Sequence, residues 1–164
     1  MKVLIVFVSS HGTTEKAAHI LSDFVEGDVE IVDLNVNRHP DLSQYDAIII
    51  GASIHGGLIS RKEKNFIAKN LHILLSKKIA LFLCCMNEGE IAIHQFNKAF
   101  PEVLRNHAIA GGLFGGELIF SKMNFLQRQI IKKVSGASED ISKLDVDVIK
   151  EFANQFNKEC LCEV

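Results

Sequence analysis

The chain has 164 residues, of which 48% are hydrophobic and 23% are charged. These proportions are typical of a globular domain and exclude a disordered chain. The formal net charge of −2 argues against non-specific nucleic-acid binding as the main activity, and it is small for a strongly acidic electron shuttle. A chain of this length buries one core, so we expect a single domain over residues 1–164.

Membrane insertion and a disulfide framework are both disfavoured. The longest apolar run, residues 79–86, is far shorter than the ~20 residues that a membrane-spanning helix needs. No small-residue cleavage site follows the apolar run near the N-terminus, so we expect no signal peptide and a cytoplasmic protein. The four cysteines, for which we expect reduced thiols and no metal, are Cys84, Cys85, Cys160 and Cys162.

Five short segments are predicted as strands. Residues 3–8, 47–50, 78–84 and 108–113 are apolar almost throughout, as in strands buried on both faces of a parallel sheet. Residues 29–34 alternate between apolar and polar side chains, which is typical of a strand nearer an edge.

Amphipathic segments between these strands are predicted as helices. They cover residues 14–25, 61–75, 90–106 and 145–157, and Pro101 breaks the third of them. Between the second and third strands the sequence indicates only a loop or a short helix. Buried strands that alternate with amphipathic helices predict an α/β fold with a single, doubly wound, five-stranded parallel sheet.

One further segment, residues 117–134, has no counterpart in this minimal pattern. It combines an apolar helical stripe with basic residues. The stripe consists of Ile119, Met123, Leu126, Ile130 and Val134, and the basic residues are Lys122, Arg128, Lys132 and Lys133. Such a helix either lies on an anionic membrane or covers the core with its lysines in water, and we favour the second interpretation.

The loop after the first strand is rich in hydroxyl groups. Ser9, Ser10, Thr13 and Thr14 surround Gly12 between a buried strand and a helix. At the start of a helix the N–H groups are unpaired and the helix dipole is positive. Hydroxyl and amide groups can wrap a phosphate dianion without a lysine. The loop is therefore a candidate phosphate site, although helix capping alone would also explain these residues.

Three common nucleotide and phosphoryl sites are disfavoured by the same loop. The glycine pattern G-x-G-x-x-G of dinucleotide-binding folds is absent after the first strand. The pattern G-x-x-x-x-G-K-[ST] of P-loop nucleotide hydrolases is also absent. The first strand ends in serines rather than aspartates, which argues against a phospho-accepting receiver domain.

The segment Ser9-Ser10-His11-Gly12-Thr13-Thr14 resembles the FMN phosphate loop of flavodoxins, commonly [ST]-x-[TS]-G-x-T, with His11 in place of a hydroxyl residue. Residues 51–57 and 85–89 resemble the second and third flavin loops. The resemblance covers nearly the whole chain and implies a flavodoxin-like sheet of order 2-1-3-4-5 with FMN as cofactor. It assigns FMN binding to Ser9, Ser10, His11, Gly12, Thr13, Thr14, Ala52, Ser53, Ile54, His55, Gly56, Gly57, Cys85, Met86, Asn87 and Glu88.

A closer likeness within this superfamily rests on residues 48–54, 109–113, 132–136, 138–140 and 149–153. In these segments the chain resembles the menaquinone-dependent protoporphyrinogen IX dehydrogenases and their flavodoxin-domain relatives. That resemblance implies dehydrogenation of a porphyrinogen by FMN, with a quinone as electron acceptor. The chain departs from that family after the fourth strand, where the family has a longer, basic segment and this chain has a short one that begins Asn87-Glu88-Gly89-Glu90.

The expected surroundings of the flavin ring favour an enzyme. Typical flavodoxins enclose the ring between Trp and Tyr, whereas this chain has no Trp and its one tyrosine, Tyr45, precedes the third strand. Ile54, His55 and Met86 are the expected neighbours, and they leave room for a second planar molecule. The flavin supplies the redox chemistry, so no catalytic residue is assigned. His55 is a candidate for moving a proton, and a backbone-bonded loop histidine explains it equally well.

Other residues near these loops are candidates for substrate contact. An apolar substrate could be bordered by Phe114, Phe120 and Phe125. Acidic groups such as propionates could be received by Arg61, Lys62 and Lys64, although a solvated helix face explains these three equally. Strand alternation sends the thiols of Cys84 and Cys85 to opposite faces, and we expect core packing rather than redox chemistry.

The expected function is therefore that of an FMN-dependent oxidoreductase, of the quinone-linked protoporphyrinogen dehydrogenase type. Its partners would be a porphyrinogen or quinone, or a redox partner protein, and not nucleic acid. The alternatives are a flavodoxin-type electron carrier, an NAD(P)H:quinone reductase, and a scaffold or interaction domain without flavin. Peripheral contact with the inner face of the cell membrane would suit an enzyme that reduces a lipid-soluble quinone, and the oligomeric state stays open.

Overall fold

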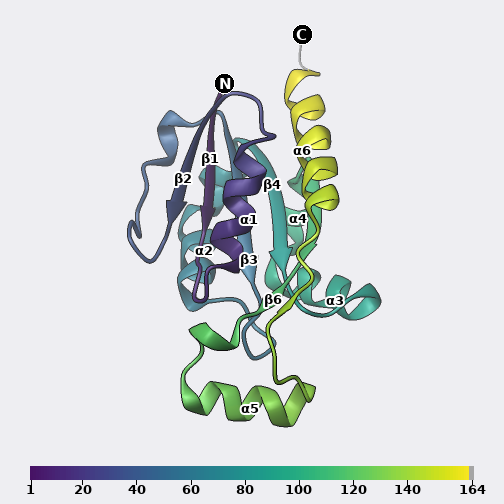
Figure 1. Cartoon of the computed structure of the whole chain (residues 1–164). Helices are drawn as coiled ribbons and strands as arrows, with labels where there is room; N and C mark the ends of the chain where they lie inside the picture. Colours follow the sequence, from purple (N-terminus) through teal and green to yellow (C-terminus); the bar gives the residue numbers. More distant parts are fainter. Residues whose placement is uncertain (163–164) are drawn as a thin grey trace.

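The computed structural model describes residues 1–162 and has a five-stranded parallel sheet at its centre. The strands are β1 (Lys2–Phe7), β2 (Asp28–Asp33), β3 (Ala47–Ser53), β4 (Lys78–Cys84) and β5 (Ala110–Gly115). Their order in the sheet is β2-β1-β3-β4-β5 (Figure 1). The predicted doubly wound sheet is confirmed, and β1 and β3 lie side by side where the strand order reverses.

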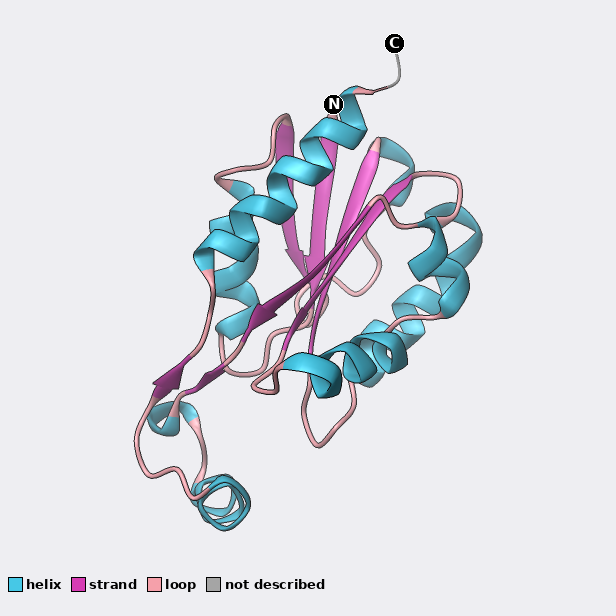
Figure 2. Cartoon of the chain, turned by 90° about the vertical axis from the view of Figure 1, so that its right-hand side faces the viewer, coloured by secondary structure: helices cyan, strands magenta, loops and turns pink. Residues whose placement is uncertain are grey.

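Helices cover both faces of the sheet (Figure 2). One face packs against α1 (Thr13–Ser22) and α6 (Val146–Leu161). The other packs against α2 (Arg61–Leu74), α3 (Gly89–Ala99) and α4 (Glu102–His107). Pro101 separates α3 from α4, because its missing N–H and fixed φ suit the start of a new helix. A short 3₁₀ helix, η1 (Leu42–Gln44), lies between β2 and β3.

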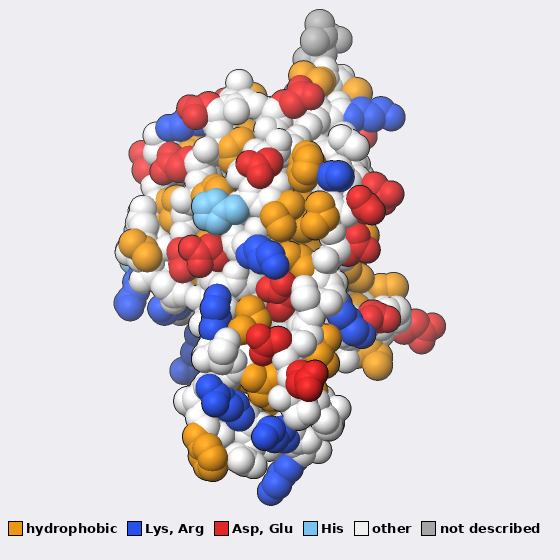
Figure 3. All heavy atoms as spheres, in the orientation of Figure 1, with side chains coloured by type: hydrophobic (Ala, Val, Ile, Leu, Met, Phe, Trp, Pro, Cys, Tyr) orange, Lys and Arg blue, Asp and Glu red, His pale blue; other side chains and the backbone are white. Residues whose placement is uncertain are grey.

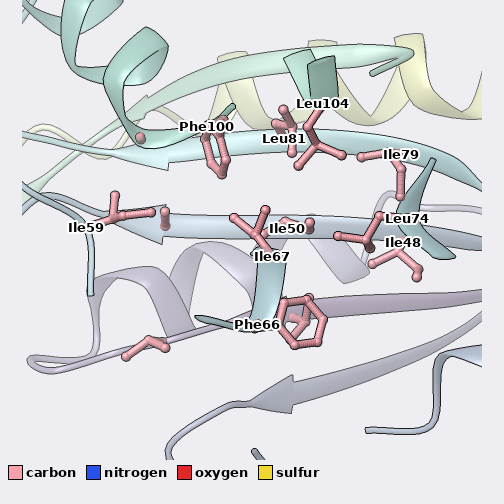
Figure 4. Close-up of a cluster of buried hydrophobic side chains, with 14 of the residues drawn as sticks. Ile48, Ile50, Ile59, Phe66, Ile67, Leu74, Ile79, Leu81, Phe100 and Leu104 are labelled. Atoms are coloured by element: carbon pink, nitrogen blue, oxygen red, sulfur yellow. The ribbon is translucent and has the colours of Figure 1, made fainter. Parts of the chain in front are cut away.

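The core consists of two layers because successive side chains of a strand point to opposite faces. In β1, Leu4 and Val6 face the α2 side, whereas Val3, Ile5 and Phe7 face α1 and α6. All five side chains are at most 2% exposed, which explains the uniformly apolar sequence of this strand. The layer on the α2 side is drawn in Figure 4, where the strand residues Ile50 and Leu81 lie among side chains of the covering helices.

Residues 116–143 form an insertion between β5 and α6. It contains β6 (Glu117–Leu118), the 3₁₀ helix η2 (Phe120–Lys122), α5 (Phe125–Ser135) and β7 (Ile141–Ser142). The antiparallel pair of β6 and β7 forms its stem, and Figure 2 shows α5, seen end-on, standing clear of the layers around the sheet. No residue of α5 is buried. The prediction that its apolar stripe covers the core is therefore wrong.

The helix within the insertion is also shorter than predicted. A capping box starts it, in which the Asn124 side chain accepts from the Gln127 N–H and the Gln127 side chain accepts from the Asn124 N–H. Gly136, with a φ of 68°, ends it in the left-handed conformation that glycine favours. Residues 117–122 are not part of this helix, since β6 pairs with β7 and η2 follows.

Two of the cysteines lie where strand alternation predicts them. Cys84 and Cys85 are buried on opposite faces of the sheet. Cys160 lies within α6, which continues beyond the predicted end at residue 157. Among residues 1–162, every helix falls short of the length and apolar character that crossing a bilayer requires.

Candidate functional site

A cavity of about 280 Å³ lies at the carboxyl ends of β1, β3 and β4. Three loops that follow these strands form one side of it, and the insertion forms the other. In a doubly wound sheet, ligands bind at this edge, beside the point where the strand order reverses. The predicted site residues that line the cavity are Ser9, Ser10, His11, Thr13, Thr14, Ser53, Ile54, His55, Gly56, Cys85 and Met86.

The first loop leaves the start of α1 open. Gly12 is the N-cap residue, and its φ of 92° lies in the left-handed region that glycine adopts without strain. The Gly12 N–H donates to Ser9 Oγ at 3.0 Å, which closes the loop on itself. Within residues 1–162 no side chain caps α1, so the N–H groups of its first turn keep their capacity to bind an anion.

The second loop brings two imidazoles together. The ring of His55 lies 5.5 Å from the ring of His11, measured between centroids, and His55 Nε2 is 3.0 Å from Ser53 Oγ. Burial, together with the nearby His11, lowers the pKa of His55. His55 is therefore uncharged at neutral pH and is able to accept a proton.

Two thiols that stay protonated lie at the end of β4, Cys84, and at the start of the third loop, Cys85. Burial raises the pKa of the Cys84 thiol to about 12, and burial also raises the pKa of Cys85. The Cys85 thiol donates to the Asn87 carbonyl at 3.5 Å. Because the thiolate is the reactive form, neither residue is an effective nucleophile or redox group at neutral pH.

Five predicted cofactor-binding residues do not line the cavity: Gly12, Ala52, Gly57, Asn87 and Glu88. Ala52 is fully buried beneath the second loop, in the core. Glu88 forms an ion pair with Lys143 at 2.6 Å, and this pair lowers its pKa. Gly12 shapes the backbone of the first loop, although it does not line the wall of the cavity.

The insertion supplies most of the wall that the sequence did not reveal. The additional lining residues are Cys84, Gly116, Glu117, Leu118, Met123, Gln127, Ile130 and Ile131. Met123 and Ile130 belong to the apolar stripe recognised in the sequence. Only these two members of the stripe line the cavity, whereas Leu126 and Val134 are 68% and 80% exposed, so the stripe is divided between the cavity and solvent.

Glu117 fastens the insertion to the first loop and α1. Its side chain accepts from Lys16 Nζ at 2.8 Å, from Ser142 Oγ at 2.7 Å and from Thr13 Oγ1 at 3.5 Å. Burial raises the pKa of this carboxyl, but the hydrogen bonds from Lys16 and Ser142 outweigh that effect, and the net pKa is lowered. The carboxylate is thus charged at neutral pH, and both of its oxygens accept hydrogen bonds.

The aromatic and basic residues expected to border a substrate lie elsewhere. Phe114 is fully buried and stacks on Phe82 at 4.6 Å between centroids, and Phe120 is also buried. Phe125 is 77% exposed. Lys62 donates to Asn35 Oδ1 at 2.5 Å, and none of Arg61, Lys62 and Lys64 lines the cavity. Burial makes the expectation wrong for Phe114 and Phe120, whereas substrate contact by Phe125 and the three basic residues, which lie outside the cavity, stays a prediction.

A buried carboxyl ties two parts of the site's base together. Glu63 Oε1 accepts from the Val8 N–H and Glu63 Oε2 accepts from the Ser60 N–H, both at 3.1 Å. Val8 precedes the first loop, and Ser60 is the N-cap residue of α2. Desolvation raises the pKa of Glu63 to about 8, against the lowering effect of the two N–H donors.

Comparison with known proteins decides the family. The family model of the flavodoxin domain matches residues 4–145, most of the chain. This protein belongs to the flavodoxin domain family. Among solved structures, oxidised flavodoxin 1 from Bacillus cereus superposes with a TM-score of 0.60 and is 23% identical, covering 96% of this chain and 98% of that one. At this identity the likeness establishes the fold.

Two curated relatives differ in how much they cover. The flavodoxin-like domain-containing protein BilS of Clostridioides difficile is 32% identical over 84 residues, half of this chain and 46% of BilS. This chain therefore matches about half the length of that relative. Protoporphyrinogen IX dehydrogenase [quinone] of Leishmania major is 24% identical over 94% of this chain and 74% of its own length.

Membership of the flavodoxin family supports FMN as the cofactor, and the cavity fits it. Hydroxyl groups of Ser9, Ser10 and Thr13, together with the open N–H groups of α1, suit a phosphate dianion. Apolar side chains, among them Ile54 and Met86, suit the ring system. The cavity thus offers polar groups for the phosphate of FMN and apolar side chains for its ring system.

Proposed function

We propose that this flavodoxin-domain protein is an FMN-dependent oxidoreductase that acts on a flat, apolar substrate of the porphyrinogen or quinone class. The observation that supports this proposal is an apolar roof over the cavity, formed by Met123, Ile130 and Ile131 of the insertion. A carrier that passes electrons to other proteins needs an accessible flavin edge. An apolar wall on the side of the insertion suits an enzyme that also receives a small, apolar substrate.

In this proposal the first loop binds the phosphate, through the hydroxyls of Ser9, Ser10 and Thr13 and the N–H groups of α1. Ile54 and Met86 contact the ring system. When bound, FMN supplies the capacity to take up a hydride equivalent from one substrate and release it to another. The protein itself contributes binding, orientation and the exclusion of water.

His55 is the residue proposed to handle a proton. It is uncharged at neutral pH because burial lowers its pKa, and its Nε2 lies beside Ser53 Oγ. Oxidation of a porphyrinogen releases protons together with electrons, so a neutral imidazole in the cavity wall is suitably placed to hold one at Nε2.

The likeness to the Leishmania major protoporphyrinogen IX dehydrogenase supports the choice of substrate class. It extends over 94% of this chain, so it includes the insertion as well as the sheet. The printed activity belongs to that protein. For this chain, a porphyrinogen as electron donor and a quinone as acceptor are proposals.

The experiment is an anaerobic titration of the yellow FMN-loaded protein. We expect protoporphyrinogen IX to bleach the flavin and menaquinone to restore its colour. Ile131→Gln, in the roof, should slow bleaching several-fold, whereas Leu126→Gln, a matched change outside the cavity, should leave the rate unchanged. Flavin that stays oxidised with protoporphyrinogen IX would contradict the proposal.

Electron transfer to a partner protein is the second candidate. Phe125 and Leu126 are 77% and 68% exposed on α5, and they offer an apolar contact for another protein. In that case Leu126→Gln would slow reduction by the partner while Ile131→Gln would not. The same pair of variants therefore separates the carrier from the enzyme.

We also propose peripheral contact with an anionic membrane, which would serve a lipid-soluble quinone. Lys and Arg side chains gather over the lobe that contains α5 (Figure 3). Exposed Phe125 and Leu126 on the same helix would enter the interface while Lys132 and Lys133 meet lipid headgroups. Co-sedimentation with anionic vesicles, and none with neutral ones, is the expected result.

A further inference from the structure

Lys122 lies against the first loop although 110 residues separate it from Gly12. It is the last residue of η2, in the insertion. Its Nζ is 2.8 Å from the point where a Cβ on residue 12 would stand. Gly12 is the N-cap of α1, so the ammonium group lies at the rim of the proposed phosphate site.

The ammonium of Lys122 has no anionic partner within residues 1–162, where no carboxylate oxygen comes within 4.0 Å of it. Glu117, the acidic residue nearest to Lys122 in the sequence, already binds Lys16, Ser142 and Thr13. A cation beside the positive end of a helix is unfavourable by itself. The arrangement becomes favourable when an anion lies between the ammonium and the helix.

The backbone on both sides of Lys122 is held in place. The Phe120 N–H donates to Asp140 Oδ1 at 2.7 Å, and the Phe120 side chain is buried. Arg128 Nε donates to the carbonyls of Phe120, at 2.8 Å, and of Met123, at 3.0 Å. These bonds hold the backbone of η2 at both ends. Lys122 therefore extends towards the first loop from a backbone that is fixed in place.

We propose that Lys122 binds the phosphate of FMN, opposite the N–H groups of α1. This inference rests on the proposed binding of FMN. The phosphate dianion would then be bound by hydroxyl groups, by the N–H groups of α1 and by the ammonium of Lys122. The ammonium would compensate for the hydroxyl group that is missing at His11. This contact would join the insertion to the cofactor. It would also make the affinity of the protein for FMN depend on the phosphate group of FMN.

The test compares FMN with riboflavin, which has the same ring system but no phosphate. Dissociation constants are measured by quenching of flavin fluorescence in the wild type, in Lys122→Gln and in Lys122→Arg. Lys132→Gln is the matched control, since Lys132 is an exposed lysine of the same insertion that lies on α5, whereas Lys122 lies on η2 beside Gly12. A charge-assisted hydrogen bond predicts that Lys122→Gln weakens FMN binding about tenfold or more.

The expected pattern is specific to the phosphate. Lys122→Gln weakens FMN and leaves riboflavin unchanged, Lys122→Arg retains most of the FMN affinity, and Lys132→Gln matches the wild type. Equal losses for both flavins, or no loss for FMN, would overturn the role of Lys122 while leaving FMN binding intact. A wild-type protein that binds neither flavin would instead overturn the proposed function.

Discussion

Glu63 makes stability depend on pH in an unusual direction. Its pKa rises from the ordinary 4.5 to about 8 in the folded protein, because desolvation outweighs the two N–H donors. Between these values the folded protein keeps a proton that the unfolded chain releases. The free energy of unfolding is therefore highest below pH 4.5, falls as the pH rises towards 8, and levels off above it.

The size of the effect follows from the shift. One pKa unit corresponds to about 1.4 kcal/mol, so the whole change amounts to roughly 5 kcal/mol. Glu63→Gln removes the titrating group, so the fall in stability that Glu63 causes should be absent from the profile of the variant. At pH 5 the variant should be less stable than the wild type by about 1–3 kcal/mol, since one buried N–H loses its acceptor. This deficit should reverse by pH 8, because the wild type loses more than about 3 kcal/mol of stability between pH 5 and pH 8.

Urea unfolding at half-unit steps from pH 5 to 8.5 measures both profiles. Glu90→Gln is the matched control, because Glu90 is exposed in the first turn of α3. Its replacement should leave the change of the unfolding free energy with pH as it is in the wild type. Parallel profiles for the wild type and Glu63→Gln would refute the reasoning. They would mean that the donors at Val8 and Ser60 keep the carboxylate charged throughout.

Two further predictions concern packing and thiol chemistry. Gly51→Ala places a Cβ 2.1 Å from the ring of Phe82, so calorimetry should record a loss of about 1–3 kcal/mol, whereas Gly111→Ala, with a nearest contact of 3.4 Å, should change stability little. Partial alkylation followed by mass spectrometry should modify exposed Cys162 first and leave Cys84 intact, because burial raises its pKa to about 12; early labelling of Cys84 would contradict this.

The sheet was predictable because its strands are buried on both faces. Such strands need apolar side chains at every position, and residues 3–8 and 47–50 have them. The hydroxyl-rich loop was equally readable, since a buried strand, a short polar loop and a helix must place it at the sheet edge. The break between α3 and α4 was also predictable, because Pro101 lacks the N–H that a continuous helix would need at that position.

The insertion was not predictable in the same way. Its helical period indicated an apolar face, but a period does not say whether that face meets a core or a cavity. Pairing of Glu117 with Ser142 is a contact between distant residues and leaves no local pattern. The contribution of Lys122 is similar, because only the folded stem brings it to Gly12.

The aromatic residues illustrate another limit. Phe114 lies near the end of β5, and its apolar character suited both a substrate wall and the core. Stacking on Phe82 decides in favour of the core, since Gly51 leaves the space that the Phe82 ring fills. Close packing of this kind depends on three segments at once, which the sequence of any one of them does not report.

The stem of the insertion has an evolutionary consequence. The chain enters and leaves the insertion at one point, where Leu118 pairs with Ile141 and the Lys143 N–H bonds to the Gly116 carbonyl at 2.8 Å. A segment attached in this manner can be lengthened, shortened or exchanged between homologous proteins without moving a strand of the central sheet. Genetic exchange of this one module would diversify what the fold accepts, while the loops at the strand ends are inherited unchanged.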